Sequence, residues 1–557
     1  MESAGEERVS LTDASRRLIL LELLVPTVLL AFGIYHGFVQ TLYRAGIIRA
    51  ESFLGIDYYQ GLTLHGVINA IVFTTMFAVA FGNALVARFL GREPPVGAAW
   101  VSFALMTVGT LLAAFAMFTG RASILYTFYP PLVAHPTFYI GAALLVVGSW
   151  VAFFNWIPLY RSWRRENPGR KTPLAIVGIF ATFVVWMMAT LPLAYEVIVM
   201  LIPWSLGMVR EINVLLARTL FWFFGHPLVY FWLLPAYVMY YVMLPRIAGG
   251  KLYSDFAGRL VFMLFIVFSA PVGVHHQFGD PGISVSWKWL QTLLTYGVAL
   301  PSLITAFTLA ASLEYAARQN GGTGLLRWWT RLPYWDRERW LFGYFFAGLF
   351  LFLFGGVTGL INASYSVNNL VHNTAWVPGH FHTTIAGPVF LAFIAMTLHL
   401  VSELTGKPVR LKSWNVAVPY LWLLGVALLS IGMSISGIDG EPRRTNLGLG
   451  YTNPGSELFV PQWASMARVV AAGGGIMLFA MVVYFAVLVS TLLSKRQREP
   501  GLGFPVAEAY HDEPAGFVAN FRPWIVIGVL ICAIAYAPVL YDVSRATFFG
   551  SPSYTPD

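Results

Sequence analysis

Long apolar runs separated by short polar segments make up most of the chain. A membrane-spanning helix needs about 20 mostly apolar residues, and thirteen runs of this kind occur. Inside a bilayer the backbone polar groups must be satisfied within the segment, so each run predicts a helix. The predicted spans are residues 18–40, 60–87, 99–118, 137–160, 173–203, 215–245, 259–278, 287–317, 340–362, 379–402, 415–437, 466–494 and 523–543. The pattern predicts an all-α polytopic membrane protein of about 13 transmembrane helices, with residues 1–557 forming one membrane domain.

The composition supports a membrane protein and indicates how it is oriented. Hydrophobic residues make up 57% of the chain and charged residues only 11%, whereas soluble domains carry roughly 25% charged residues. If the N-terminus is inside, most of the 35 lysines and arginines fall in inside loops such as 161–171 and 494–500. The positive-inside rule then predicts a cytoplasmic N-terminus and a C-terminus outside. Because this orientation explains the basic residues, we expect a lipid bilayer as partner and no nucleic acid.

Six of the eleven histidines fall at a similar depth in four predicted spans, in the outer part of the bilayer. Ionisable residues are costly within a membrane and mark functional sites by default. The six are His65, His226, His275, His276, His380 and His382. The alternative is a structural role, in which they are hydrogen-bonded core residues of a transporter. For four of the other five, His36, His135, His399 and His511, we expect caps or ordinary hydrogen bonds; His372 lies in the loop just before the span that begins at 379.

The spacing of three of these histidines favours a copper site. His275 and His276 are adjacent at the end of a span, where they can converge on one ion, and His226 is the candidate third ligand. Three imidazoles with an open position suit a copper ion that binds a small molecule. Tyr230 follows His226 by four residues, so the two side chains share one helix face and can touch.

The other three histidines suit haem iron. His380 and His382 are two residues apart, about 200° around a helix, so one helix could hold a haem on each face. If His65 pairs with His382, that haem has two axial histidines and is low-spin. His380 would then hold a second haem from one side and leave its sixth position open.

The motifs that carry these histidines resemble a known family. They read "QGLTLHG" at 60–66, "GHPLVYFWLLPAY" at 225–237, "PVGVHHQF" at 271–278 and "HNTAWVPGHFH" at 372–382. They resemble the catalytic subunit of haem–copper terminal oxidases, and closely subunit I of the B-type (ba-type) cytochrome c oxidases. The resemblance covers nearly the whole chain and includes "ILYTFYPPL" at 124–132 and "GEPRRTN" at 440–446.

The resemblance implies a respiratory oxidase that reduces O2 to water with electrons from cytochrome c and pumps protons. By resemblance, His65 and His382 bind the low-spin haem b, and His380 binds a high-spin haem of a type. His226, His275 and His276 bind copper B, and Tyr230 is the residue that the family joins covalently to His226. We therefore expect a multi-pass protein of a bacterial or archaeal plasma membrane.

The resemblance also implies partner subunits. The chain has a single cysteine, Cys532, so it lacks the thiolates for a second copper centre and we expect Cys532 to be a packing residue. Electrons should arrive through a subunit II that carries copper A, with cytochrome c as donor and a quinol as the alternative. A small single-helix subunit is also compatible with the resemblance.

Two polar stripes predict a proton path. Tyr230, Tyr237 and Tyr241 are spaced to share one helix face that descends inward. On the next span but one, Ser302, Thr305, Thr308 and then Glu314 lie at near-helical spacing. Hydroxyls in membrane helices often bond only to the backbone, yet two stripes aimed at Tyr230 favour proton conduction. These positions are similar to the single K-type path of the B-type oxidases. Leu228 replaces the glutamate that ends another channel in the A-type branch, so we expect no such channel.

Polar residues in the outer loops complete the expected site. Arg443 and Arg444 could be a solvated pair, but by resemblance they bind haem propionates, for which the guanidinium geometry is suited. His372 is similar to a family histidine near the propionates of the high-spin haem. Asn368 stands where the family often has an aspartate, and its amide cannot carry a proton as an acid does.

Two other functions are compatible with parts of this pattern. Nitric oxide reductases of the same superfamily use iron in place of copper B, lack the motif tyrosine and carry extra glutamates near the metal, so Tyr230 and Leu228 argue against them. A non-redox transporter could use the polar stripes for an ion or solute, and it would bind no haem.

Overall fold

Helices form nearly all the regular structure in the computed structural model, which describes residues 8–48, 55–545 and 550–552. Within these residues, 13 helices or helix series are long and apolar enough to cross a membrane. They are Asp13–Arg44, Tyr58–Leu90, Val96–Phe118, Pro136–Glu166, Leu174–Ser205, Val214–Val242, Asp255–Gln277, Val285–Gln319, Leu341–Ala363, Trp376–Thr405, Lys412–Ile438, Pro461–Leu493 and Phe521–Ser544. The predicted all-α polytopic architecture is thereby confirmed.

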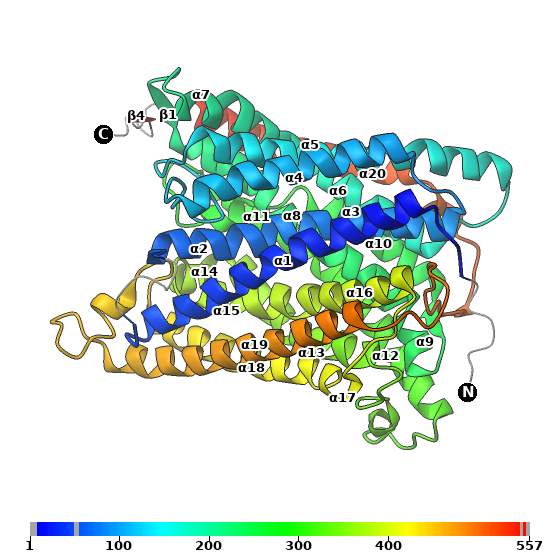
Figure 1. Ribbon diagram of the computed structural model, residues 1–557. Helices are drawn as coiled ribbons and strands as arrows, with labels where there is room; N and C mark the ends of the chain where they lie inside the picture. Colours follow the sequence, from blue (N-terminus) through cyan, green and yellow to red (C-terminus); the bar gives the residue numbers. More distant parts are fainter. Residues whose placement is uncertain (1–7, 49–54, 546–549, 553–557) are drawn as a thin grey trace.

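The spans run side by side as one elongated bundle, and the start of α1 and the end of α20 lie at its opposite ends (Figure 1). The α-helices are α1 Asp13–Arg44, α2 Tyr58–Val67, α3 Phe73–Leu90, α4 Val96–Phe118, α5 Pro136–Glu166, α6 Leu174–Tyr195, α7 Ile202–Ser205, α8 Val214–Val242, α9 Leu244–Ala248, α10 Asp255–Ser269, α11 Val285–Gly297, α12 Ala299–Gln319, α13 Leu341–Ala363, α14 Tyr365–Val371, α15 Trp376–Phe381, α16 Pro388–Thr405, α17 Lys412–Asn415, α18 Val418–Ile438, α19 Pro461–Leu493 and α20 Phe521–Ser544.

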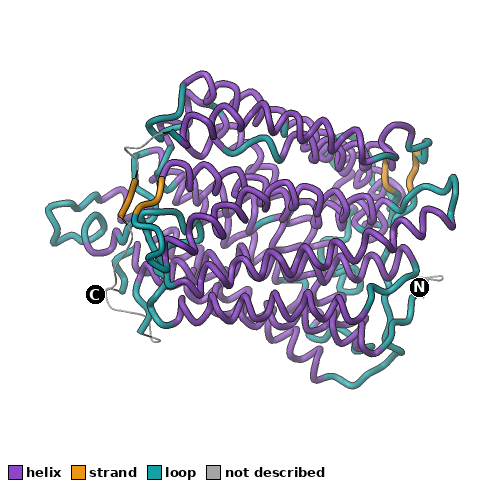
Figure 2. The backbone as a smooth tube through the Cα atoms, turned by 90° about the horizontal axis from the view of Figure 1, so that it is seen from above, coloured by secondary structure: helices purple, strands orange, loops and turns teal. Residues whose placement is uncertain are grey.

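The strands lie outside the bundle, in the connecting segments at its two ends (Figure 2). β1 (Glu211–Asn213) pairs antiparallel with β4 (Gly550–Pro552), so the end of the chain returns to the segment before α8. β2 (Leu252–Ser254) pairs parallel with β3 (Ala509–His511) at the opposite end. Both sheets have two strands and tie distant parts of the sequence together.

Side-chain caps begin several of the long helices. The Asp57 carboxylate accepts a hydrogen bond of 2.7 Å from the Gln60 N–H at the start of α2. The Asn213 side chain accepts one of 2.9 Å from the Leu216 N–H at the start of α8. Such caps satisfy N–H groups that have no partner within the helix. They fix where the two helices that carry His65 and His226 begin.

Glycines allow the outer helices to pack closely. A Cβ on Gly109 of α4 would lie 2.5 Å from the carbonyl oxygen of Gly141 in α5, and a Cβ on Gly473 of α19 would lie 2.6 Å from that of Gly425 in α18. Small residues at helix crossings let two backbones approach within a membrane. These two close pairs flank the central helices that carry the histidines.

Three spans depart from regular α-helix next to the histidines. The predicted run 259–278 is interrupted: α10 ends at Ser269, and a 3₁₀ turn at Val274–Gln277 follows Pro271. Proline lacks an N–H and clashes with the preceding turn, which stops the helix. π-helical segments at Ile68–Val72 and His382–Ala386 interrupt the spans of His65 and His382. Such π segments are frequent at functional sites.

Candidate metal and haem site

A cavity of about 800 Å³ opens among the central helices. Its lining includes all six intramembrane histidines, from spans that are far apart in the sequence. Of the other residues predicted for the site, it also includes Tyr230, Tyr237, Ser302, Thr305, His372, Arg443 and Arg444, whereas Tyr241 and Thr308 lie outside the lining. The convergence expected from the sequence is therefore present.

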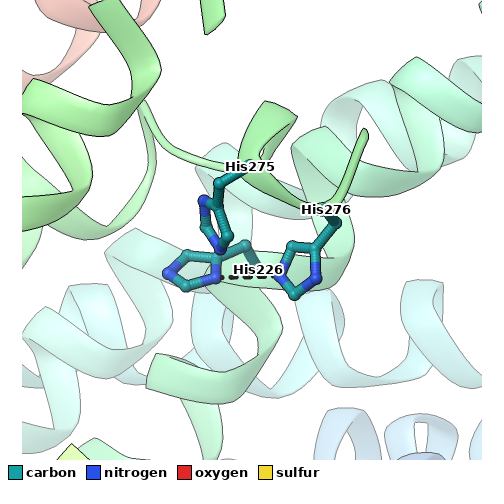
Figure 3. Close-up of side chains that lie close together, drawn as sticks. All are labelled: His226, His275 and His276. Carbon is teal, nitrogen blue, oxygen red and sulfur yellow. Dashed lines mark hydrogen bonds between the residues drawn. The ribbon is translucent and has the colours of Figure 1, made fainter. Parts of the chain in front are cut away.

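Three of these histidines form a compact group that could hold a metal ion. His226 lies on α8, and His275 and His276 lie on the 3₁₀ turn after α10, with one ligand atom of each within 4.8 Å of the others. Nδ1 of His226 faces Nε2 of His276 at 3.1 Å (Figure 3). The His276 ring stacks on Trp222, with centroids 3.9 Å apart, which fixes its plane. Three converging imidazoles suit a borderline transition metal such as copper.

The tautomer of His275 follows from its neighbour Thr295. The Thr295 hydroxyl donates to the Gln291 carbonyl at 2.6 Å, so its oxygen is left to accept from Nδ1–H of His275 at 3.1 Å. Nε2 then carries the free lone pair. An outer hydrogen bond of this kind orients a metal-binding imidazole and raises its basicity.

His65 and His382 face each other across the cavity with nearly parallel rings. Their centroids are 6.2 Å apart and their planes differ by 12°. Nδ1 of His65 lies 2.9 Å from the Gly33 carbonyl, and Nδ1 of His382 lies 2.7 Å from that of Pro378. Because a carbonyl only accepts, each Nδ1 carries the proton and each Nε2 is free. The pair fits the two axial ligands of one haem iron.

His380 presents a single free nitrogen in the same way. The Thr358 hydroxyl donates to the Gly355 carbonyl at 2.9 Å and accepts from Nδ1–H of His380 at 2.9 Å. A Cβ on Gly359 would lie 3.3 Å from the His380 ring, so glycine leaves room beside the imidazole. This arrangement fits the one protein ligand of a haem with an open sixth position.

Tyr230 contacts the three-histidine group directly. Its hydroxyl lies 2.9 Å from Nε2 of His226, one helical turn away on α8. His226 therefore presents Nδ1 toward His276 and Nε2 toward the phenol. A phenol in this position can exchange a proton and an electron with groups bound in the cavity.

The two polar stripes meet at one hydrogen bond. The Tyr241 hydroxyl on α8 donates to Thr305 Oγ1 on α12 at 3.0 Å. Ser302, Thr305 and Thr308 also donate to carbonyls of their own helix, as hydroxyls in membrane helices commonly do. Glu314 is ion-paired with Arg318 at the exposed end of α12. The geometry thus links the stripes, while conduction along them stays a prediction.

The arginine pair is partly buried rather than solvated. Arg444 Nη1 donates to the Tyr129 hydroxyl at 2.8 Å, while its buried Nη2 has no partner among the described residues. Burial and the neighbouring Arg444 guanidinium lower the pKa of Arg443 to about 10. Two adjacent guanidiniums that line the cavity with unused donors are suited to an anion such as a haem propionate.

Asn368 fixes the orientation of His372. Its Nδ2 donates to the Asn362 carbonyl at 2.7 Å, so its Oδ1 accepts from Nδ1–H of His372 at 2.8 Å. Nε2 of His372 is left as the proton acceptor. Burial, and then the charge of Arg443, lowers the pKa of His372 to about 4, so the imidazole is neutral at pH 7.

Most of the remaining histidines have structural roles, as does the cysteine. His135 caps α5 by accepting from the Thr137 N–H, His399 lies 2.9 Å from the Gly503 carbonyl, and His511 packs against Tyr253. His36 is buried against the ring of Tyr35. Cys532 is a free, buried thiol within α20.

Several residues that support the site were not identified from the sequence. Thr295 and Thr358 belong to runs that read only as apolar spans, so nothing marked their hydroxyls as partners of histidines. Arg44 and Glu441 form a buried ion pair beside the arginine loop, although they lie far apart in the sequence. Only the motif "GEPRRTN", which places Glu441 two residues before Arg443, carried a signal.

Sequence comparison relates the chain to respiratory oxidase subunits. The family model described as "Cytochrome C and Quinol oxidase polypeptide I" matches residues 17–477. Cytochrome c oxidase subunit 1 of Thermus thermophilus is 42% identical over 496 residues, which cover 87% of this chain and 86% of the relative. Quinol oxidase subunit 1 of Sulfolobus acidocaldarius is 26% identical over 415 residues, covering 70% and 75%.

The fold is also similar to that of a solved structure. A heme-copper terminal oxidase dimer determined by cryo-electron microscopy aligns with a TM-score of 0.96 and 54% sequence identity. The alignment covers 98% of this chain and 96% of the other. The similarity therefore includes both the spans and the segments that connect them.

Proposed function

The chain belongs to the cytochrome c and quinol oxidase polypeptide I family and is subunit I of a haem–copper terminal oxidase, and we propose that O2 is reduced to water in its histidine-lined cavity. Membership of the family implies haem and copper centres in a multi-pass membrane protein. The observation that carries the proposal is the group of His226, His275 and His276, which converges beside Tyr230 and shares a cavity with the other three histidines.

We assign copper B to His226, His275 and His276. The hydrogen bond that Nδ1–H of His275 donates to Thr295 leaves Nε2 of His275 free, and His226 turns Nδ1 toward its partners, which supports this ligand set. The described residues place no Cys, Asp or Glu in this group, so the ligands are all imidazoles. Bound metals in such a cavity would hold O2 and deliver electrons to it.

We assign the low-spin haem b to His65 and His382, and the high-spin haem of a type to His380. The facing rings of the first pair support two axial ligands, whereas the single free nitrogen of His380 supports one. The unpartnered Arg444 Nη2 and the lowered pKa of Arg443 support propionate binding at the arginine loop. His372 lies in the same cavity lining and would contact a haem propionate there.

Tyr230 would supply an electron and a proton to the reaction. Its hydroxyl is hydrogen-bonded to His226, so the phenol is held next to the proposed metal ligands. Protons would reach it along Tyr237, Tyr241, Ser302, Thr305 and Thr308, and this uptake would be coupled to pumping across the membrane. The Tyr241–Thr305 hydrogen bond between α8 and α12 supports this path.

We propose cytochrome c as the electron donor, through a subunit II that carries copper A. The similarity to cytochrome c oxidase subunit 1 is 42% identity, against 26% for the quinol oxidase subunit, which favours this donor over a quinol. A small single-helix subunit would complete the complex. The location is a bacterial or archaeal plasma membrane, with the N-terminus in the cytoplasm.

Elemental analysis of the purified complex tests the metal assignment. We expect two irons with one copper per chain, or with three coppers if a copper A subunit copurifies. Two haem irons with a third, non-haem iron and no copper would contradict the assignment and indicate the chemistry of a nitric oxide reductase. Extraction of the haems should yield one b-type and one a-type molecule per chain.

A further inference from the structure

A second cavity, of about 350 Å³, lies at the end of the bundle where α1 begins. It is bounded by the end of α5, the start of α6 and the segment 512–519, and it shares no lining residue with the histidine-lined cavity. Its polar lining consists of Arg164, Arg170, Lys171, Thr172, Arg259 and Asp512. By the positive-inside rule this is the cytoplasmic edge of the membrane.

Two of the cations in this cavity are already neutralised. Arg259 is fixed by both oxygens of Asp255, at 2.6 and 3.2 Å, and donates to the Thr172 carbonyl at 2.8 Å. Lys171 pairs with Asp512 at 2.5 Å and lies 3.8 Å from Asp255. Two carboxylates therefore match these two cations.

The other two cations have no counter-ion. Arg164 donates to the backbone carbonyl of Arg170 at 3.0 Å, and Arg170 reaches only the Asn167 side-chain oxygen, at 3.5 Å. Neither forms an ion pair with a carboxylate among the described residues. The cavity thus carries two uncompensated positive charges, with guanidinium groups whose geometry matches phosphate oxygens.

The surface next to the cavity is apolar and aromatic. Phe517 is 62% exposed and packs on Trp524, with ring centroids 5.9 Å apart. Beyond Trp524, α20 exposes a continuous set of aliphatic side chains, namely Val526, Ile527, Val529, Leu530 and Ile534. Aromatic residues commonly mark the level of the lipid head groups. The basic cavity adjoins the start of an exposed apolar helix. The cavity is suited to a phosphate group, and the helix surface is suited to hydrocarbon chains attached to it.

We propose that this cavity binds the head group of an anionic phospholipid, whose acyl chains lie along α20. Arg164 and Arg170 contact the phosphate, and Phe517 with Trp524 packs against the upper part of the chains. A free phosphate ion would use the basic half alone. The proposal does not rest on the redox function, because none of these residues lines the histidine cavity.

The experiment measures retention of phosphatidylglycerol by the purified complex, using native mass spectrometry during a lipid titration in detergent. Each basic residue near an anionic membrane contributes a factor of about five, so Arg164→Gln with Arg170→Gln should weaken binding about 25-fold. The matched control is Arg161→Gln with Arg165→Gln, the same charge change on the same end of α5 but outside the cavity lining. Equal weakening in both pairs, or none in the first, would overturn the proposal.

A second variant separates a lipid from a phosphate ion. Phe517→Ser should reduce phosphatidylglycerol retention severalfold and leave the binding of inorganic phosphate unchanged. If millimolar inorganic phosphate displaces the lipid, or if retention is indifferent to Phe517→Ser, the cavity is a simple anion site and the proposal fails. Oxidase activity is not needed for any of these readouts.

Discussion

Thr295 holds the Nδ1 proton of His275 through a hydrogen bond of 3.1 Å, and Thr358 does the same for His380 at 2.9 Å. Each hydroxyl is itself committed to a backbone carbonyl, so each can only accept from the imidazole. At the scale of the single residue, these bonds decide which ring nitrogen is available to a metal. They also mean that a methyl group in place of one hydroxyl would leave a buried N–H unpaired.

Thr295→Val should therefore weaken copper binding while leaving both haems in place. Loss of an outer hydrogen-bond partner of this kind typically costs about 10–100-fold in metal affinity. The measurement is copper per chain after dialysis against a graded chelator, together with the haem spectrum. Thr292→Val is the matched control, because the Thr292 hydroxyl lies one turn earlier on α11 and bonds only to the Lys288 carbonyl. Equal copper retention in both variants would contradict the role of Thr295.

Tyr230→Phe should abolish turnover without loss of haem. The change removes only the hydroxyl that lies 2.9 Å from His226 Nε2, and proton transfer by a placed group contributes about 10²–10⁴-fold to rate. Oxygen consumption and the reduced-minus-oxidised spectrum give the two readouts. Tyr484→Phe is the control, since its hydroxyl donates to the Ile394 carbonyl outside the cavity. Normal turnover in Tyr230→Phe would remove the assigned role.

At the scale of the element, the sequence predicted which segments cross the membrane but not how their backbones deviate. The thirteen spans follow from hydrophobic length, which senses only whether a segment suits hydrocarbon. The break after Ser269 and the π segment at His382–Ala386 depend on packing against other helices, which no single segment encodes. The histidines were identifiable because ionisable residues are rare in apolar membrane spans. Thr295 and Thr358 were not, because hydroxyls are common there.

Thr305→Val tests the joint between α8 and α12. It removes the acceptor of the Tyr241 hydroxyl and should slow proton uptake about tenfold or more, because a broken link interrupts the hydrogen-bonded stripe. The readout is the rate of proton uptake after O2 is added to the reduced enzyme. Thr110→Val, on α4 and bonded only to its own helix, should leave that rate unchanged. The proposed path would be wrong if both variants take up protons equally fast.

At the scale of the whole molecule, one ion pair connects the first span to the loop before α19. Arg44 at the end of α1 pairs with Glu441 and also donates to the Thr445 carbonyl at 3.3 Å. Both side chains are buried, with relative exposures of 9% and 4%. The pair therefore holds the loop that carries Arg443 and Arg444 against the bundle, so the arginine pair is positioned over the cavity.

Glu441→Gln should destabilise the complex and loosen the low-spin haem. Removing one partner of a buried ion pair leaves the other charge uncompensated and costs about 3–5 kcal/mol. The unfolding midpoint and the low-spin haem content are the measurements. Glu338→Gln breaks the exposed pair with Lys412 and should change stability by less than about 1 kcal/mol. Similar midpoints in the two variants would show that the buried pair does not secure the loop.

The opposite placement of the two chain ends gives a test of membrane orientation. An odd number of spans puts the two ends of the chain on different sides, in agreement with the positions of the start of α1 and the end of α20 in Figure 1. In intact cells, a C-terminal epitope tag should bind antibody and an N-terminal tag should bind it only after permeabilisation. The reverse labelling would invert the orientation that the positive charges predict.

The facing rings of His65 and His382 also determine when in biosynthesis the proposed haem site can be completed. About 320 residues separate these two proposed axial ligands, so at a synthesis rate of about 5–20 residues per second His382 is made roughly 15 to 60 s after His65. During that interval the proposed low-spin haem site has only one of its two axial ligands. Haem would therefore bind either to the incomplete bundle or, later, to the complete one. In either case the proposed haem site is complete only after the span that carries His382 has been synthesised.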